Sequence, residues 1–104
     1  MMKYKTKKLI DLEKKRYSIL TDDLETCYLC RSAKQDIHEI YGGSNRKVSM
    51  ENGFCVPLCR YHHRILTDNP NENLILKQTC QRVYEMTHTR KEFISLIGKN
   101  FIYK

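Results

Sequence analysis

The sequence contains no apolar run long enough to span a bilayer, because charged residues interrupt every hydrophobic stretch. Its basic start is not followed by the apolar segment of a secretory signal peptide, and no internal repeat or low-complexity linker divides the chain. These absences argue against a membrane protein and favour one small domain in a reducing cytoplasm. They leave the oligomeric state open.

Cysteine, in contrast, is plentiful. Five cysteines, an odd number, occur in 104 residues, and a chain of this length builds only a small core. Domains of this size often depend on a metal ion or on disulfides. In a reducing compartment, cysteines at short spacing are typical of metal ligands rather than of disulfides.

Basic residues outnumber acidic ones by 19 to 12, which gives a formal net charge of +7. Such an excess favours a polyanionic partner, although solubility alone would also account for it. The grouping favours the first interpretation. The basic residues gather at Lys3, Lys5, Lys7, Lys8, Lys14, Lys15 and Arg16, at Arg46 and Lys47, and at Arg60 and Arg64.

The residue pattern predicts an α+β fold, with a basic arm and short helix over residues 1–20 and one domain over residues 21–104. The expected elements are a helix across residues 9–17, strands over 35–41 and 54–58, a loop over 45–49, a helix from Cys59 to about Leu66, and two further helices capped by Asn73 and Thr89. Glu92 completes a capping box with Thr89, and Gly98 ends that last helix.

Apolar residues at helical spacing predict which sides of the last two helices face the core. The two expected stripes are Leu74, Ile75, Cys80, Val83, Tyr84 and Met86 in the first helix, and Phe93, Leu96 and Ile97 in the second. We also expect Phe101, Ile102 and Tyr103 to fold back onto the core.

Two short-spaced pairs of metal-binding residues lie in distant parts of the chain, Cys27 with Cys30 and Cys59 with His62. Zn²⁺ takes four ligands in a tetrahedron, and thiolates and imidazole suit it. We therefore predict a structural zinc knuckle, with no open position for catalysis. The alternatives are buried free cysteines in a reduced core, or Cys55 as a competing ligand.

Further polar residues lie between these two pairs. They occur in the stretch His38-Glu39-Ile40-Tyr41-Gly42-Gly43-Ser44-Asn45-Arg46-Lys47, which is followed by Val56-Pro57-Leu58-Cys59-x-x-His62-His63. With Cys27-x-x-Cys30, this combination resembles HNH endonucleases, in particular small phage-type ones, and the likeness extends to residues 16–24 and 87–94. The resemblance implies a ββα-metal core, flanked here by C-terminal helices, and metal-dependent hydrolysis of DNA phosphodiester bonds.

The resemblance also implies roles for individual residues. His38 and His63 would be ligands of a catalytic Mg²⁺ or Mn²⁺, and Glu39 stands where the general base, usually histidine, is expected. The middle asparagine of the motif falls on Asn45 or Asn52, and the third protein ligand stays open. The residues expected to contact DNA phosphates are Arg46, Lys47 and Arg64.

Other interpretations are compatible with the same residues. Glu39 also suits a carboxylate behind the ligands or a solvent-facing strand position, and the basic residues suit an ordinary charged surface. The protein would then be a zinc-stabilised DNA-binding protein with a degenerate catalytic site, or a zinc-ribbon module that binds proteins. His88 has no such context and is expected at the surface.

Overall fold

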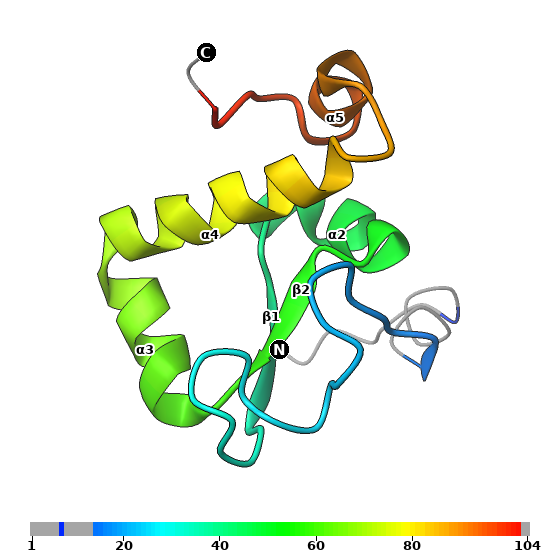
Figure 1. Ribbon diagram of the computed structural model, residues 1–104. Helices are drawn as coiled ribbons and strands as arrows, with labels where there is room; N and C mark the ends of the chain where they lie inside the picture. The colour runs from blue at the N-terminus through cyan, green and yellow to red at the C-terminus, as the bar shows by residue number, and fades with distance from the viewer. Residues whose placement is uncertain (1–6, 8–13, 103–104) are drawn as a thin grey trace.

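The computed structural model describes Lys7 and residues 14–102, which form a small α+β domain with one two-stranded sheet (Figure 1). The elements in chain order are β1 (Asp36–Glu39), the 3-10 helix η1 (Gly43–Asn45), α2 (Arg46–Asn52), β2 (Cys55–Leu58), α3 (Arg60–Asp68), α4 (Pro70–Tyr84) and α5 (Arg90–Ile97). The helix expected across residues 9–17 lies mostly outside the described residues. None of the helices in the described ranges has both the length and the apolar composition that a bilayer crossing requires.

The two strands form an antiparallel hairpin, and both are shorter than predicted. The register pairs Asp36 with Leu58, Ile37 with Pro57, His38 with Val56, and Glu39 with Cys55. Successive side chains of a strand point to opposite faces of its sheet. Asp36 and His38 therefore share one face of the hairpin, and Glu39 lies on the other.

The prediction of a loop over residues 45–49 was wrong, because η1 and α2 occupy this connection. Tertiary contacts support the short helix: Ser49 and Met50 are buried, and the Ser49 hydroxyl donates to the Tyr41 carbonyl at 2.8 Å. Gly53 ends α2 with a φ of 70°, and a Cβ placed there would lie 2.5 Å from the Tyr17 ring. Glycine thus permits both the left-handed turn and the close approach of Tyr17.

Helices α3 and α4 meet at a sharp elbow between Asp68 and Pro70. Helix α3 begins directly after Cys59, as predicted, but the prediction that Asn73 caps α4 was wrong. Pro70 occupies the first turn of α4, where its fixed φ suits a helix and its missing N–H costs nothing. Asn73 instead donates from Nδ2 to the Leu66 carbonyl at 3.3 Å and so ties α4 to α3.

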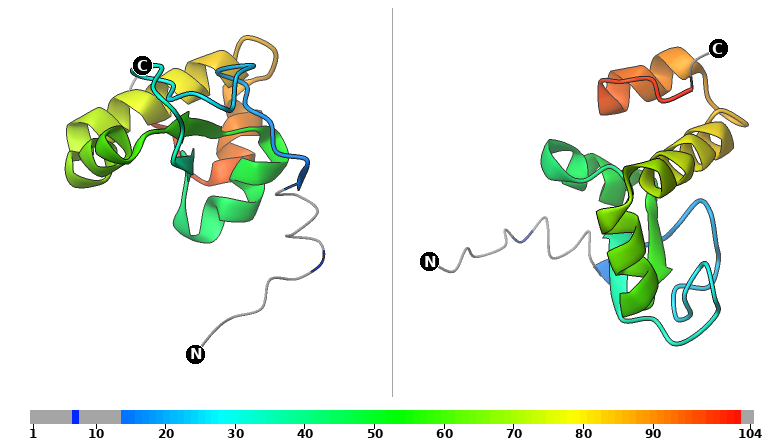
Figure 2. Two further views of the ribbon diagram at one scale, coloured as in Figure 1. Left: turned by 90° about the horizontal axis from the view of Figure 1, so that it is seen from below. Right: turned by 90° about the vertical axis from the view of Figure 1, so that its left-hand side faces the viewer.

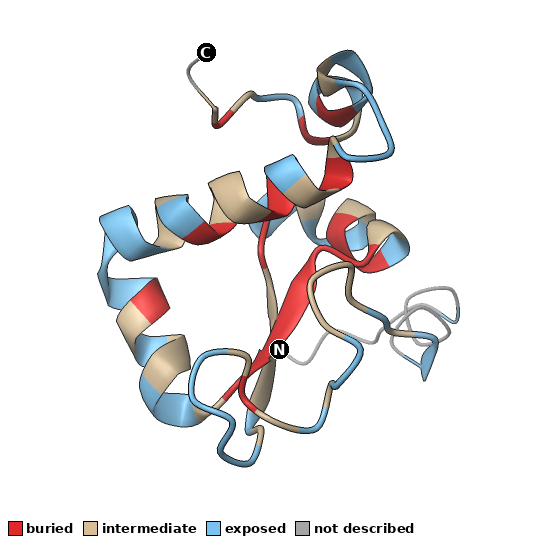
Figure 3. Cartoon of the chain, in the orientation of Figure 1, coloured by how far each residue is buried: buried red, intermediate tan, exposed pale blue. Residues whose placement is uncertain are grey.

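The core-facing side of α4 differs in part from the predicted stripe. Leu76, Cys80 and Tyr84 are buried, and they follow one another at intervals of four residues. Ile75 lies off this row and is 56% exposed, and Met86 lies beyond the end of the helix and is 80% exposed. Figure 3 shows the same division, with β2 buried along its length and the outer sides of α3 and α4 exposed.

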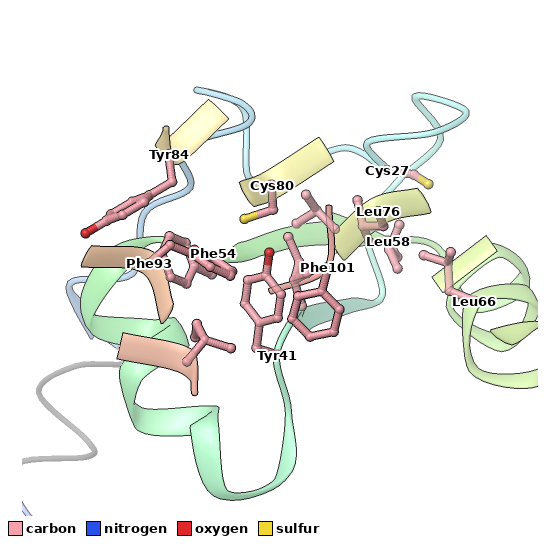
Figure 4. Close-up of a cluster of buried hydrophobic side chains, with 13 residues drawn as sticks. Cys27, Tyr41, Phe54, Leu58, Leu66, Leu76, Cys80, Tyr84, Phe93 and Phe101 are labelled. Carbon is pink, nitrogen blue, oxygen red and sulfur yellow. The ribbon is translucent and has the colours of Figure 1, made fainter. Parts of the chain in front are cut away.

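An aromatic cluster fills the centre of the domain (Figure 4). The Phe93 ring contacts four others, at centroid distances of 5.4 Å to Tyr41, 6.1 Å to Phe54, 5.9 Å to Tyr84 and 6.4 Å to Phe101. The predicted capping box of Thr89 and Glu92 and the glycine cap at Gly98 are confirmed. Phe101 returns to the core as predicted, and its N–H donates to the buried Gln81 side chain at 2.9 Å.

Helices α3 and α5 lie at opposite ends of α4 (Figures 1 and 2). The segment that precedes β1 follows the outer side of β2. Its N–H groups at Ile19, Tyr28 and Gln35 donate to carbonyls at Gly53, Pro57 and Leu58. The residues of the predicted knuckle are thereby held against the end of the hairpin that leads into α3.

Candidate metal centres

The structure brings Cys27, Cys30, Cys59 and His62 together, with their ligand atoms all within 4.8 Å of one another. The Sγ atoms of Cys30 and Cys59 are 3.8 Å apart, and His62 Nδ1 lies 3.3 Å from Cys59 Sγ and 3.7 Å from Cys27 Sγ. A tetrahedral zinc ion separates two thiolates by about 3.8 Å and a thiolate from an imidazole nitrogen by about 3.5 Å. The four side chains therefore fit Zn²⁺.

Local backbone structure orients these ligands. The knuckle turns between Cys27 and Ser32, whose backbone N–H and C=O bond at 2.7 Å, and Arg31 takes a left-handed φ of 67°. On the other side, Cys59 Sγ caps α3 by accepting the His62 N–H. This hydrogen bond lowers the pKa of the Cys59 thiol and so favours the thiolate that zinc requires.

Cys55 is not part of the cluster. It is fully buried, and its Sγ donates to the Tyr17 carbonyl at 3.1 Å. Burial raises the pKa of the Cys55 thiol to about 11, which opposes its use as a thiolate. The alternative of Cys55 as a competing ligand is wrong, and Cys80 packs in the core as predicted.

A second group of polar side chains lies where β1 faces α3. The rings of His38 and His63 pack edge to face, with centroids 5.2 Å apart. His63 Nδ1 donates to the Asp36 carboxylate, Oδ2, at 3.1 Å. Because this bond occupies Nδ1, the lone pair of a neutral His63 lies on Nε2. Asp36, His63 and His38 thus form a carboxylate–imidazole–imidazole group.

His38 is partly buried. Its Nε2 atom is inaccessible to solvent and has no hydrogen-bond partner in the described part of the chain. Burial, then the charges of His63 and Lys77, lower the pKa of His38 to about 4. The imidazole is therefore neutral at pH 7 and presents an unpartnered nitrogen, which is the form that binds a metal ion.

Asp36 was missed by the sequence analysis, although the sequence contains the signal that identifies it. It stands two residues before His38, so in a strand the two side chains share a face. A carboxylate that holds the far nitrogen of a ligating histidine is a common feature of metal sites.

Glu39 lies apart from the two histidines, on the opposite face of the hairpin. Its carboxylate accepts from Arg16 Nη2 at 2.8 Å, and Arg46 Nε lies 4.0 Å away. Both partners of the closer pair are largely buried, with side chains 16% and 15% exposed. A cavity of about 460 Å³ opens on this face, lined by Lys14, Arg16, Leu24, Glu25, Lys34, Ile37, Glu39 and Arg46.

The remaining candidate residues lie around these centres. Asn45 donates to the Ile97 carbonyl and Asn52 to the Val48 carbonyl, so both candidate amides bind the backbone. Arg64 is exposed next to His63 on α3, and Lys47 is exposed on α2. His88 is exposed, as expected, and its ring stacks on the Tyr84 ring with the two centroids 4.1 Å apart.

Comparisons with protein-family models, with curated proteins and with solved structures gave no match to this chain. We therefore infer its function from the chemistry of the two centres.

Proposed function

We propose that this protein is a metal-dependent DNA endonuclease of the HNH type, in which β1, β2 and α3 form a ββα-metal core. One observation carries the proposal. The buried, unpartnered Nε2 of His38 lies beside His63, whose other nitrogen Asp36 holds. A neighbouring zinc cluster fixes the start of α3 and therefore the position of His63, one residue after the ligand His62.

On this proposal, the second centre holds a catalytic divalent ion, Mg²⁺ or Mn²⁺. His38 and His63 would hold it, leaving positions for water and phosphate. When bound, such an ion neutralises the charge that develops on the leaving oxygen of a phosphodiester. Asp36 fixes the tautomer of His63, and the low pKa of His38 keeps that ligand neutral. Exposed Arg64, on the same helix as His63, would contact the DNA backbone, and exposed Arg46 and Lys47 would extend the basic surface.

The position of Glu39, the proposed general base, supports a second candidate function. Glu39 would accept a proton from water only after its ion pair with Arg16 opens and its carboxylate leaves the opposite face of the hairpin. Its pairing with Arg16 favours the alternative of a zinc-stabilised DNA-binding protein with a degenerate catalytic site. We give priority to the enzyme, because binding DNA alone does not require a buried, unpartnered imidazole nitrogen.

Nicking of supercoiled plasmid by zinc-loaded protein tests the proposal. We expect slow cleavage that requires Mg²⁺ or Mn²⁺ and that His38→Ala or His63→Ala abolishes. His88→Ala is the matched control, because this histidine lies outside both centres. Cleavage that survives His38→Ala would refute the assignment.

Glu39→Gln separates the two functions further. It removes the basic charge and keeps the shape, so an enzyme that uses Glu39 loses cleavage and retains DNA binding. DNA binding with no cleavage by the parent protein, under any divalent ion, would favour the degenerate site. Absence of both would favour the protein-binding module.

A further inference from the structure

A second polar cavity lies at the elbow between α3 and α4, beside the proposed catalytic centre. Its volume is about 310 Å³. It is lined by Thr67, Pro70, Asn73, Leu74, Lys77, Lys99 and Phe101. We call it the elbow pocket. The lining contains two lysines and no acidic residue, which distinguishes it from the cavity beside Glu39.

The two lysines of the elbow pocket converge on one aromatic ring. Lys77 Nζ lies 5.4 Å and Lys99 Nζ 5.3 Å from the centroid of Phe101. Tyr41 stacks on the same ring (Figure 4). In the described ranges neither ammonium has a carboxylate within ion-pair distance. A ring face attracts a cation only weakly at an exposed site, so two like charges gathered there favour an anionic ligand.

The pocket and the proposed catalytic centre share helix α3. Thr67 follows His63 by one helical turn, and its hydroxyl donates to the His63 carbonyl at 2.8 Å. One turn of helix advances by about 5.4 Å, so the pocket begins within one turn of the proposed ligand. Lys77, which lines the pocket, lies close enough for its charge to act on His38.

One residue of the pocket lining also has a buried polar atom without a partner. Asn73 Oδ1 is buried without a hydrogen bond in the described part of the chain. Asn73 precedes Lys77 by one turn of α4, on the same side of the helix. Its oxygen is a suitable acceptor for an ammonium group, and it would hold Lys77 when an anion draws that side chain away from Phe101.

We propose that the elbow pocket binds a backbone phosphate of the same nucleic-acid strand, next to the phosphodiester at the metal centre. This inference rests on the proposed function. Lysine ammonium groups act as point charges and tolerate any base sequence. Lys77 and Lys99 would therefore set the path of the strand across the elbow and would not read its sequence.

Binding to a short DNA duplex, measured by fluorescence anisotropy without divalent ions, tests the pocket separately from cleavage. For the variant Lys77→Gln/Lys99→Gln we expect weaker binding and a log–log salt slope smaller by about 0.9, the value for one phosphate contact on duplex DNA. The matched control is a pair of lysines outside the elbow pocket, Lys34→Gln/Lys91→Gln, which makes the same change in net charge. It should leave the slope closer to that of the parent.

Further measurements decide the source of the phosphate and exclude misfolding. Zinc content and thermal melting should match the parent, and the milder Lys99→Gln alone should shift the slope in the same direction. An unchanged slope in the double variant, or no DNA binding by the parent, would overturn the inference. So would inorganic phosphate that perturbs Lys77 and Lys99 in NMR spectra while DNA does not. A reduced slope in a protein that fails to cleave would uphold the pocket and reject the enzyme.

Discussion

The substitution Asp36→Asn tests whether the carboxylate behind His63 prepares the proposed second metal centre. Asp36 accepts from His63 Nδ1 at 3.1 Å, which leaves Nε2 free to bind a metal. Asparagine is nearly isosteric, but it carries no charge, and its amide can rotate and donate to Nδ1. The other tautomer then becomes accessible, with a proton on the nitrogen that should bind the ion.

The structure sets the size of the expected effect. Loss of a carboxylate behind a ligating histidine typically lowers metal affinity by about 10- to 100-fold. The side chains of His63 and Asp36 are 34% and 38% exposed, so solvent screens their interaction. We therefore expect a loss near the lower limit, about tenfold, which corresponds to about 1.4 kcal/mol.

The assay is Mn²⁺ binding to protein that already holds one equivalent of zinc, followed by electron paramagnetic resonance of the free ion. The control is Asp68→Asn, which changes an exposed carboxylate at the end of the same helix. An unchanged dissociation constant would refute the positioning role. A loss as complete as that of His38→Ala would show that Asp36 is itself a ligand.

Three further predictions concern stability. Chelation of zinc, or Cys27→Ser, should leave a largely unfolded chain by circular dichroism. Structural zinc contributes on the order of 10 kcal/mol to folding, and the whole free energy of unfolding of a domain is only about 5–15 kcal/mol. A folded, zinc-free protein would contradict this prediction. Gly53→Ala should lower the unfolding free energy by more than about 1 kcal/mol in urea titrations, since φ is 70° and the new Cβ meets Tyr17. Burial raises the pKa of Cys55 to about 11 and of Cys80 to about 12, from 9.0 for a free thiol. The stability that these buried neutral thiols contribute is complete below pH 9 and is lost as pH rises from 9 towards 12. Cys80→Ala should therefore flatten the decline of unfolding free energy with pH. An equal slope of unfolding free energy against pH in the parent and in Cys80→Ala would contradict the assignment.

The parts of the fold that the sequence predicted are those in which a local signal decides the structure. The spacing of Cys27, Cys30, Cys59 and His62 predicted, without knowledge of the fold, that these four side chains come together as possible zinc ligands. The Thr89 capping box lies within four residues of chain, and the structure contains it. Each of these features depends on a few neighbouring side chains, so distant packing does not change it.

The errors lie where tertiary contacts outweigh local preference. Helix α2 is short, and it forms because Met50 and Ser49 are buried against the hairpin. The sequence analysis placed the cap of α4 at Asn73, whereas Pro70 begins that helix, because proline is suited to the first turn. Asp36 was within reach of the sequence, because strand alternation places it beside His38.

The position of Glu39 could not be derived from the motif alone. Adjacency in sequence suggested that Glu39 and His38 act together, but neighbours in a strand point to opposite faces. Its partner Arg16 lies 23 residues earlier, in a segment with no pattern that links it to the strand. The face that a residue occupies depends on which elements pack on each side of the hairpin, and that is a property of the whole fold. The histidines meet because α3, which begins beside the candidate zinc ligands, packs against β1, whereas Glu39 meets the basic segment that crosses the other face. The two faces therefore provide separate chemistry, a neutral imidazole pair on one and a paired carboxylate among basic side chains on the other.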